Sequence, residues 1–175
     1  KEDRVEISGV ALFKKDRMVH KLGIEQSHDL VLLRGLKCRS YLPFTVQEGG
    51  TVDRGTALVQ NSRKVKYSRS NGLHSFIITV KLKGTLEEYS NQGVIDQYHL
   101  NKIEKVIEKQ VKAQCESFID RMKNELRLDC IDISKYALAK DRKALSKSIS
   151  NPDFIENADI KVMVKVHLEN TAEMR

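Results

Sequence analysis

The chain contains 175 residues with a mass of 20.0 kDa, a length typical of one domain. Hydrophobic residues make up 40% of it and charged residues 31%, with 9 Gly and 2 Pro. This composition is typical of a folded chain, and it excludes collagen-like, Pro-rich and disordered classes. No apolar run approaches the roughly 20 residues of a membrane-spanning helix. We therefore expect residues 1–175 to form a single domain.

The net charge is positive, because 31 Lys and Arg residues stand against 24 Asp and Glu residues, for a formal charge of +7. Residues 1–90 hold 16 basic and 10 acidic side chains, whereas the remainder holds 15 and 14. The basic excess therefore lies in the first half of the chain, where a positive surface favours an anionic partner.

The first elements are a hairpin and a short helix. Residues 5–14 and 17–22 alternate apolar and polar side chains, which predicts two strands joined by a tight turn. Residues 23–35 contain an apolar cluster, which predicts a short helix with Ser27 as its N-cap and Gly35 at its end.

A second hairpin follows. Asn71-Gly72 is typical of a type I′ turn, because both residues tolerate positive φ. We expect this turn to join antiparallel strands at residues 58–68 and 73–82, with further strand residues near 37–46.

The strongest helical pattern covers residues 96–127. Asp96 is the predicted N-cap, and Glu108 and Lys112 are spaced to form an ion pair along the helix. The apolar residues recur every three or four positions and predict one buried stripe. These residues are Leu100, Ile103, Ile107, Val111, Cys115, Phe118, Met122 and Leu126.

A shorter helix is predicted at residues 133–148, and Pro152 with its neighbours is expected to break the chain after it. Residues 160–168 alternate strictly, which predicts a final strand with one buried face and with His167 on the wet face. Hairpins dominate the pattern, so we expect an α+β fold. The expected architecture is a two-layer sandwich in which one long and one or two short helices pack on one face of a mainly antiparallel or mixed, twisted β-sheet.

Motifs for catalysis or cofactor binding are missing from the sequence. There is no Gly-rich phosphate loop, no GxSxG elbow, no CxxC and no HxxxH or HExxH pair. We therefore predict no catalytic residue, no cofactor and no metal, and we expect Cys38, Cys115 and Cys130 to be buried free thiols. Asp129 and Asp132 precede a predicted helix, so helix capping is favoured over acid–base catalysis.

One cluster has a functional character. Arg63, Lys64, Lys66 and Arg69 lie around Tyr67 on a predicted strand. They are the candidate interaction surface, for nucleic acid phosphates, anionic lipid headgroups or an acidic protein. The structural alternative is an edge strand that Lys and Arg keep from pairing with another chain.

Several motifs occur in an order that resembles a known family. Residues 7–19 (ISGVALFKKDRMV) combine two strands around a "G-x-A-x-F-K-x-D" run, and LDCID at 128–132 follows the long helix. Residues 151–154 and the strand IKVMVKV at 160–166 come next. Together they resemble the C-terminal domain of the C subunits of bacterial spore germinant receptors, the Ger(x)C family. The glycine usual after the Asp-Ile run is absent, so the chain resembles a divergent member.

The resemblance implies a non-enzymatic receptor subunit that acts in spore germination with integral-membrane A and B subunits. It also implies a lipoprotein whose signal peptide, lipid-modified (palmitate-bearing) cysteine and N-terminal domains lie upstream of this chain. The anchor would hold the protein on the outer face of the inner spore membrane. The alternative is a basic α+β module that binds nucleic acid or another anionic surface. Nucleic acid is disfavoured, because aromatic residues for base stacking make up only 6% of the chain.

Overall fold

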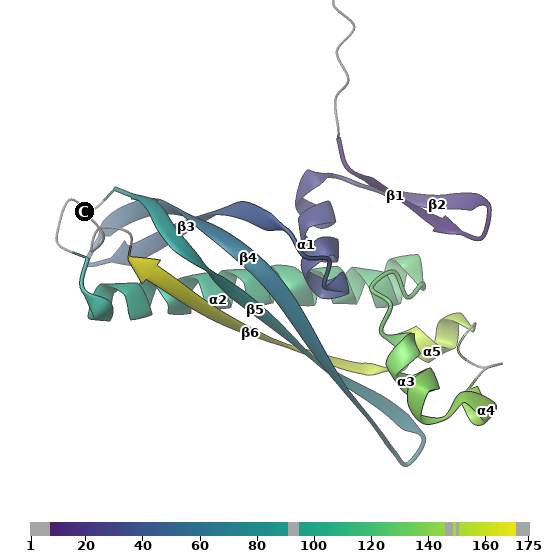
Figure 1. Cartoon of the computed structure of the whole chain (residues 1–175). Helices are drawn as coiled ribbons and strands as arrows, with labels where there is room; N and C mark the ends of the chain where they lie inside the picture. Colours follow the sequence, from purple (N-terminus) through teal and green to yellow (C-terminus); the bar gives the residue numbers. More distant parts are fainter. Residues whose placement is uncertain (1–7, 91–94, 146–148, 150, 171–175) are drawn as a thin grey trace, which may run out of the picture.

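The computed structural model describes residues 8–90, 95–145, 149 and 151–170. Its elements form an α+β arrangement in which helices cover one face of a twisted four-stranded sheet, while a separate two-stranded hairpin stands apart from that sheet (Figure 1). In chain order they are β1 (Val10–Lys14), β2 (Arg17–Leu22), α1 (Ile24–Arg34), β3 (Arg39–Glu48), β4 (Thr51–Ser70), β5 (Leu73–Tyr89), α2 (Gln97–Arg121), the π-helical turn η1 (Met122–Leu126), α3 (Ser134–Lys140), α4 (Arg142–Leu145), α5 (Pro152–Glu156) and β6 (Asp159–Asn170).

The large sheet has the strand order β3-β4-β5-β6 and is mixed. β3, β4 and β5 are antiparallel neighbours, whereas β6 runs parallel to β5. Asn71 and Gly72 form the β4–β5 turn with φ values of 49° and 81°, as type I′ geometry requires. The predicted hairpin is confirmed, and both strands extend further than the sequence indicated.

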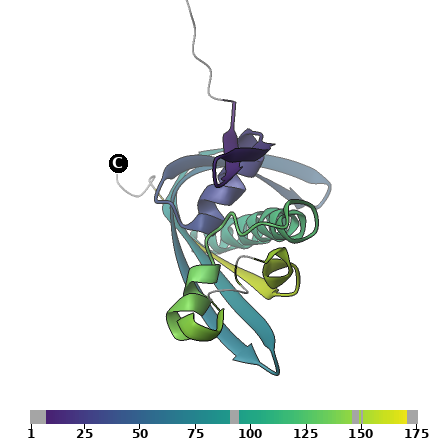
Figure 2. The same ribbon diagram turned by 90° about the vertical axis from the view of Figure 1, so that its right-hand side faces the viewer.

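The core lies between this sheet and α2. On β5, the inward residues Phe76, Ile78 and Val80 are fully buried, and β6 follows the same alternation. Figure 2 views α2 end-on and shows that it packs on one side of the sheet. The predicted α+β two-layer sandwich is therefore confirmed, although α1, α3, α4 and α5 make more short helices than expected.

Helix α2 begins where the sequence predicts. The Asp96 carboxylate accepts a hydrogen bond from the His99 backbone N–H at 2.9 Å, and the apolar stripe is buried along its length. The helical segment ends at Leu126, close to the predicted end, where Arg127 adopts φ 48°, but its last five residues form the π-helical η1 instead of α-helix. A π-turn contains one more residue per hydrogen-bonded turn than an α-helix, so η1 rotates the side chains that follow it relative to the face of α2.

The predicted Glu108–Lys112 ion pair is wrong. Glu108 instead accepts hydrogen bonds from the Lys105 ammonium at 2.7 Å and from the backbone N–H of Val166 at 3.1 Å. Glu104 likewise accepts from the backbone N–H of Leu168 at 2.7 Å. These glutamates satisfy donors along the outer edge of β6, which would otherwise be open to pairing with another chain.

Three local predictions also need correction. Ser27 does not cap α1, because the helix begins after Gly23 and the Ser27 hydroxyl donates back to the Gly23 carbonyl at 2.7 Å. The helix predicted at 133–148 is divided at Asp141 into α3 and α4, and residues 146–148 lie outside the described part. Pro152 does not break the chain, because it occupies the first turn of α5, where its missing N–H has no cost.

The remaining elements agree with expectation. β1 and β2 pair as predicted, although residues 5–7 lie outside the described range and the hairpin forms its own small sheet. Cys115 and Cys130 are buried, Cys38 is half-buried, and all three are free thiols. None of the helices in the described residues is long and apolar enough to cross a membrane.

Candidate functional site

The four basic residues of the predicted interaction surface lie on opposite faces of β4. Side chains alternate along a strand, and the odd-numbered Val59 and Val65 point toward the helices. Arg63 and Arg69 share that parity, whereas Lys64 and Lys66 are exposed on the outer face. The four therefore do not form one surface.

Arg63 is held by three groups beneath the sheet. Its guanidinium donates hydrogen bonds to the carbonyl of Leu33 and, at 2.8 Å, to that of Ile131. It also lies 5.7 Å from the centre of the Tyr136 ring. Gly35 makes room for it, since a Cβ there would lie 2.8 Å from the Arg63 Cβ. Arg63 thus joins β4 to the end of α1 and to the loop before α3.

Arg69 lies near the tip of the β4–β5 hairpin. Its guanidinium is 3.9 Å from the carboxylate of Asp141, with both side chains nearly half exposed. An ion pair of this kind contributes little to stability in water. Arg69 is therefore available to a partner, but it faces α3 and α4 rather than the side of the sheet that carries Lys64 and Lys66.

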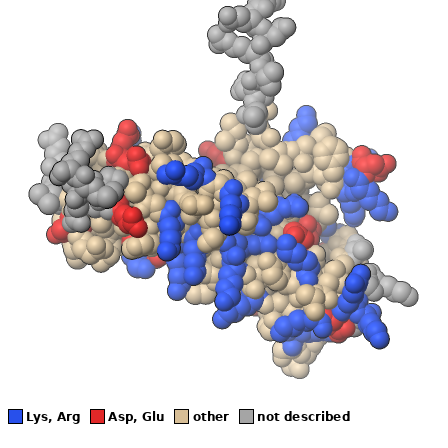
Figure 3. All heavy atoms as spheres, in the orientation of Figure 1, with Lys and Arg blue, Asp and Glu red and all other residues tan. Residues whose placement is uncertain are grey.

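The outer side of the large sheet gathers further basic residues. These basic residues lie in four consecutive rows, each made of residues that are paired across neighbouring strands. We call the four rows the open face, because no described helix or strand packs on this side of the sheet. The rows are Lys66-Ile77-Lys161, Lys64-Thr79-Met163, Ser62-Lys81-Lys165 and Arg39-Gln60-Lys83-His167. Figure 3 views this side and shows Lys and Arg side chains gathered across the sheet.

The open face has one sign of charge. Its rows contain six lysines and Arg39 and no Asp or Glu. Within the described residues, Lys161 pairs with Asp159 at 3.4 Å, and the other five lysines form no ion pair. Since these side chains are exposed, their charges remain available to a partner.

Sequence reasoning missed the basic residues that complete this surface, namely Arg39, Lys81, Lys83, Lys161 and Lys165. The alternation of residues 160–168 predicts Lys161 and Lys165 on the exposed face of the last strand, but nothing in the sequence places that strand beside the β4–β5 hairpin. The positions of Lys81 and Lys83 opposite β4 could have been predicted from the type I′ turn, because the turn fixes which β4 and β5 residues are paired.

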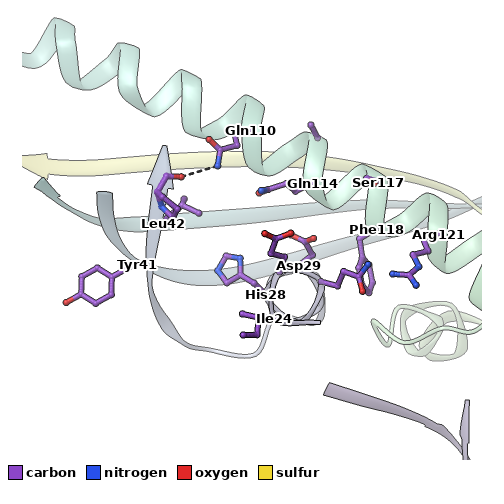
Figure 4. Close-up of a pocket in the computed structure, with 14 residues that line it drawn as sticks. Ile24, His28, Asp29, Tyr41, Leu42, Gln110, Gln114, Ser117, Phe118 and Arg121 are labelled. Carbon is purple, nitrogen blue, oxygen red and sulfur yellow. Dashed lines mark hydrogen bonds between the residues drawn. The ribbon is translucent and has the colours of Figure 1, made fainter. Parts of the chain in front are cut away.

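A groove of about 680 Å³ is a second candidate site, between α1, β3 and α2. Figure 4 shows His28 and Asp29 on α1 facing Gln114 and Ser117 of α2. Asp29 is half-buried, and burial together with the nearby Glu25 raises the pKa of its carboxyl to about 6. Burial lowers the pKa of His28, which favours the neutral imidazole at neutral pH.

The groove lacks a catalytic arrangement. His28 Nε2 lies 3.2 Å from the hydroxyl of Ser40, and Gln110 donates to the carbonyl of Pro43 at 3.1 Å, so both are engaged in structural contacts. Among its described lining residues, no base is hydrogen-bonded to Ser117, which therefore lacks the activation a nucleophile needs.

Asp129 and Asp132 have structural roles. The two carboxylate oxygens of Asp129 accept from the backbone N–H groups of Ile133 and Ser134, at 3.1 and 2.8 Å. Asp132 pairs with Lys135 at 2.5 Å. Asp129 thus satisfies backbone donors at the start of α3, although the N-cap position itself is Ile133, and the capping role predicted for Asp132 is wrong. Across the described residues, no group of three or more His, Cys, Asp or Glu side chains is placed to hold a metal ion.

Comparison with a solved structure supports the fold. The chain is similar to the crystal structure of the GerBC protein, with a TM-score of 0.76 and 21% sequence identity. The match covers 93% of this chain and 50% of that one, so the chain spans half the length of this relative. No curated protein matches the chain.

A family model described as "Spore germination B3/GerAC like, C-terminal" matches residues 8–172. This match includes both hairpins, α2 and β6, and thus all the elements that carry the open face and the groove. The chain therefore belongs to the family of spore germination B3/GerAC-like C-terminal domains.

Proposed function

We propose that this chain is the C-terminal domain of a germinant receptor C subunit and acts in spore germination without catalysing a reaction. Family membership over residues 8–172 carries the proposal. The site chemistry supports it, since neither the groove nor the open face contains an activated nucleophile in the described residues. Such a domain acts by binding.

The partners we propose are the integral-membrane A and B subunits of the receptor. A lipid anchor upstream of this chain holds the domain on the outer face of the inner spore membrane. Tethering of this kind raises the effective concentration of the domain near its partners, so weak contacts suffice for assembly. Of the predicted interaction residues, Lys64 and Lys66 are exposed on the open face and Arg69 is exposed beside α3 and α4, whereas Arg63 is engaged beneath the sheet.

The test is germination of spores whose full-length C subunit lacks residues 8–172. We expect these spores to lose optical density after nutrient addition as slowly as spores without the subunit. Immunoblotting of the spore membranes controls for the amount of truncated protein. Germination at the wild-type rate, with the truncated protein present in normal amount, would contradict the proposal.

Nucleic-acid binding is the alternative function, and the open face gives it some support through its positive charge. Proteins that bind single strands stack bases on aromatic side chains. The four rows of the open face contain no Phe, Tyr or Trp. We therefore favour the receptor function.

A further inference from the structure

We propose that the open face is a docking surface for an anionic phospholipid bilayer. This inference deepens the proposed function, because it assigns the side of the domain that meets the membrane. It is tested on the isolated chain without receptor subunits, so it can fail while the proposed function stands. Its basis is the number, spacing and chemistry of the charges on the four rows.

The charges on the open face act together. Neighbouring strands lie about 4.8 Å apart, and alternate residues of one strand about 7 Å apart. Both spacings are shorter than the screening length of about 8 Å at physiological salt. Lys81 and Lys165 even lie in directly paired positions, where like charges repel. Arg39 and the five lysines that form no ion pair among the described residues therefore produce a positive field across the four rows, and Lys161 adds to it beside Asp159.

Protection of a sheet edge does not explain the whole surface. Lys64 and Lys66 do lie on an edge segment, because β3 pairs with β4 only as far as Gln60. Lys81 and Lys83, however, lie on β5, which is paired with β4 on one side and β6 on the other. An internal strand needs no charge to prevent pairing. Lysines that repel one another there indicate binding to something anionic.

The composition favours a bilayer over an acidic protein. Protein interfaces centre on buried aromatic or Arg side chains and are depleted in Lys. The open face has the opposite composition, with six lysines and no aromatic ring in its rows. Lysine is a hydrated point charge on a flexible stem, which suits a fluid layer of phosphate headgroups better than one fixed geometry.

Exposed apolar side chains between the lysines fit the same partner. Ile77 is 39% exposed within the row of Lys66 and Lys161, and Met163 is 48% exposed in the next row. Exposed apolar side chains on a membrane-facing surface can enter the boundary between the lipid headgroups and the acyl chains. The opposite layer of the domain carries the mixed charges of α2, so an anionic membrane attracts the open face selectively.

The experiment measures binding of the 175-residue chain to vesicles of phosphatidylcholine with and without about one-third phosphatidylglycerol. The test variant is K64Q/K81Q/K165Q, from three strands of the open face. The matched control is K105Q/K109Q/K112Q, three exposed lysines of α2 on the other layer. Each triple lowers the formal charge of +7 by three, so the two are matched in net charge. Two of the control lysines, Lys105 and Lys112, form ion pairs with Glu108 and Glu116, whereas the three open-face lysines form none within the described residues. A second open-face triple, K66Q/K83Q/K161Q, guards against misfolding of the first.

We expect binding that requires the anionic lipid and weakens with salt. Each lysine near an anionic surface raises the membrane partition coefficient about fivefold, so the partition coefficient of an open-face triple should fall about 100-fold. The α2 control should change only severalfold, with unchanged circular dichroism in all variants. Equal losses in the two layers would overturn the proposal, as would equal binding to neutral vesicles. Binding to polyglutamate or duplex DNA but not to vesicles would also overturn it and assign the face to an acidic protein or to nucleic acid.

Discussion

Arg63 and Lys64 are neighbours with the same charge, yet they have opposite surroundings. Arg63 donates to two backbone carbonyls beneath the sheet, whereas Lys64 is exposed on the open face. The difference follows from strand alternation, since Val59 and Val65 mark the inward parity. The sequence pattern could therefore have separated the two residues. It could not have supplied the partners of Arg63, which are carbonyls distant in the chain.

This contrast predicts different effects of alanine at the two positions. R63A should lower the free energy of unfolding by about 2–3 kcal/mol, because it leaves two carbonyls without a charged donor. K64A should change it by no more than about 0.5 kcal/mol. Urea denaturation of the two variants provides the comparison. Equal stabilities would show that Arg63 does not join β4 to α1 and the α3 loop.

At the level of elements, the β4–β5 hairpin was the most predictable part of the fold. The turn at Asn71-Gly72 sets the pairing from Ser70↔Leu73 to Gln60↔Lys83, and each of these pairs sums to 143. Alternation then assigns the faces of both strands. The parallel position of β6 beside β5 was not predictable, because the two strands are connected through several helices. No local sequence motif specifies which strand the chain pairs with after such a crossover.

Two glycines of β5 and its turn allow a test of this hairpin. A Cβ at Gly84 would lie 1.9 Å from the carbonyl oxygen of Leu58, whereas one at Gly72 would have nothing within 4 Å. G72A therefore has only the conformational cost of φ 81°, about 1–2 kcal/mol. G84A must separate the strands and should cost more than G72A, about 3 kcal/mol.

Thermal unfolding of both glycine variants checks the prediction. We expect the melting temperature of G84A to fall well below that of G72A. The reverse order would mean that the close approach of β4 and β5 at Leu58 is not maintained in solution.

At the scale of the whole molecule, the domain has two distinct sides. The open face presents lysines from three strands, and the other layer presents α2, with the groove between it, α1 and β3. If the open face rests on lipid, the helical layer is left to meet other receptor subunits. The sequence revealed the basic excess of the first half, but it could not show that β6 adds Lys161 and Lys165 to the same surface.

Co-purification of the receptor tests whether this domain is needed for assembly of the C subunit with the A and B subunits. The tagged full-length C subunit is recovered from detergent-solubilised inner spore membranes in three forms: intact, without residues 8–172, and with K64Q/K81Q/K165Q. We expect the A and B subunits to co-purify with the intact protein and with the triple variant, and to be lost when residues 8–172 are removed. Equal recovery of A and B without residues 8–172 would contradict this expectation, because their docking site would then lie elsewhere in the C subunit.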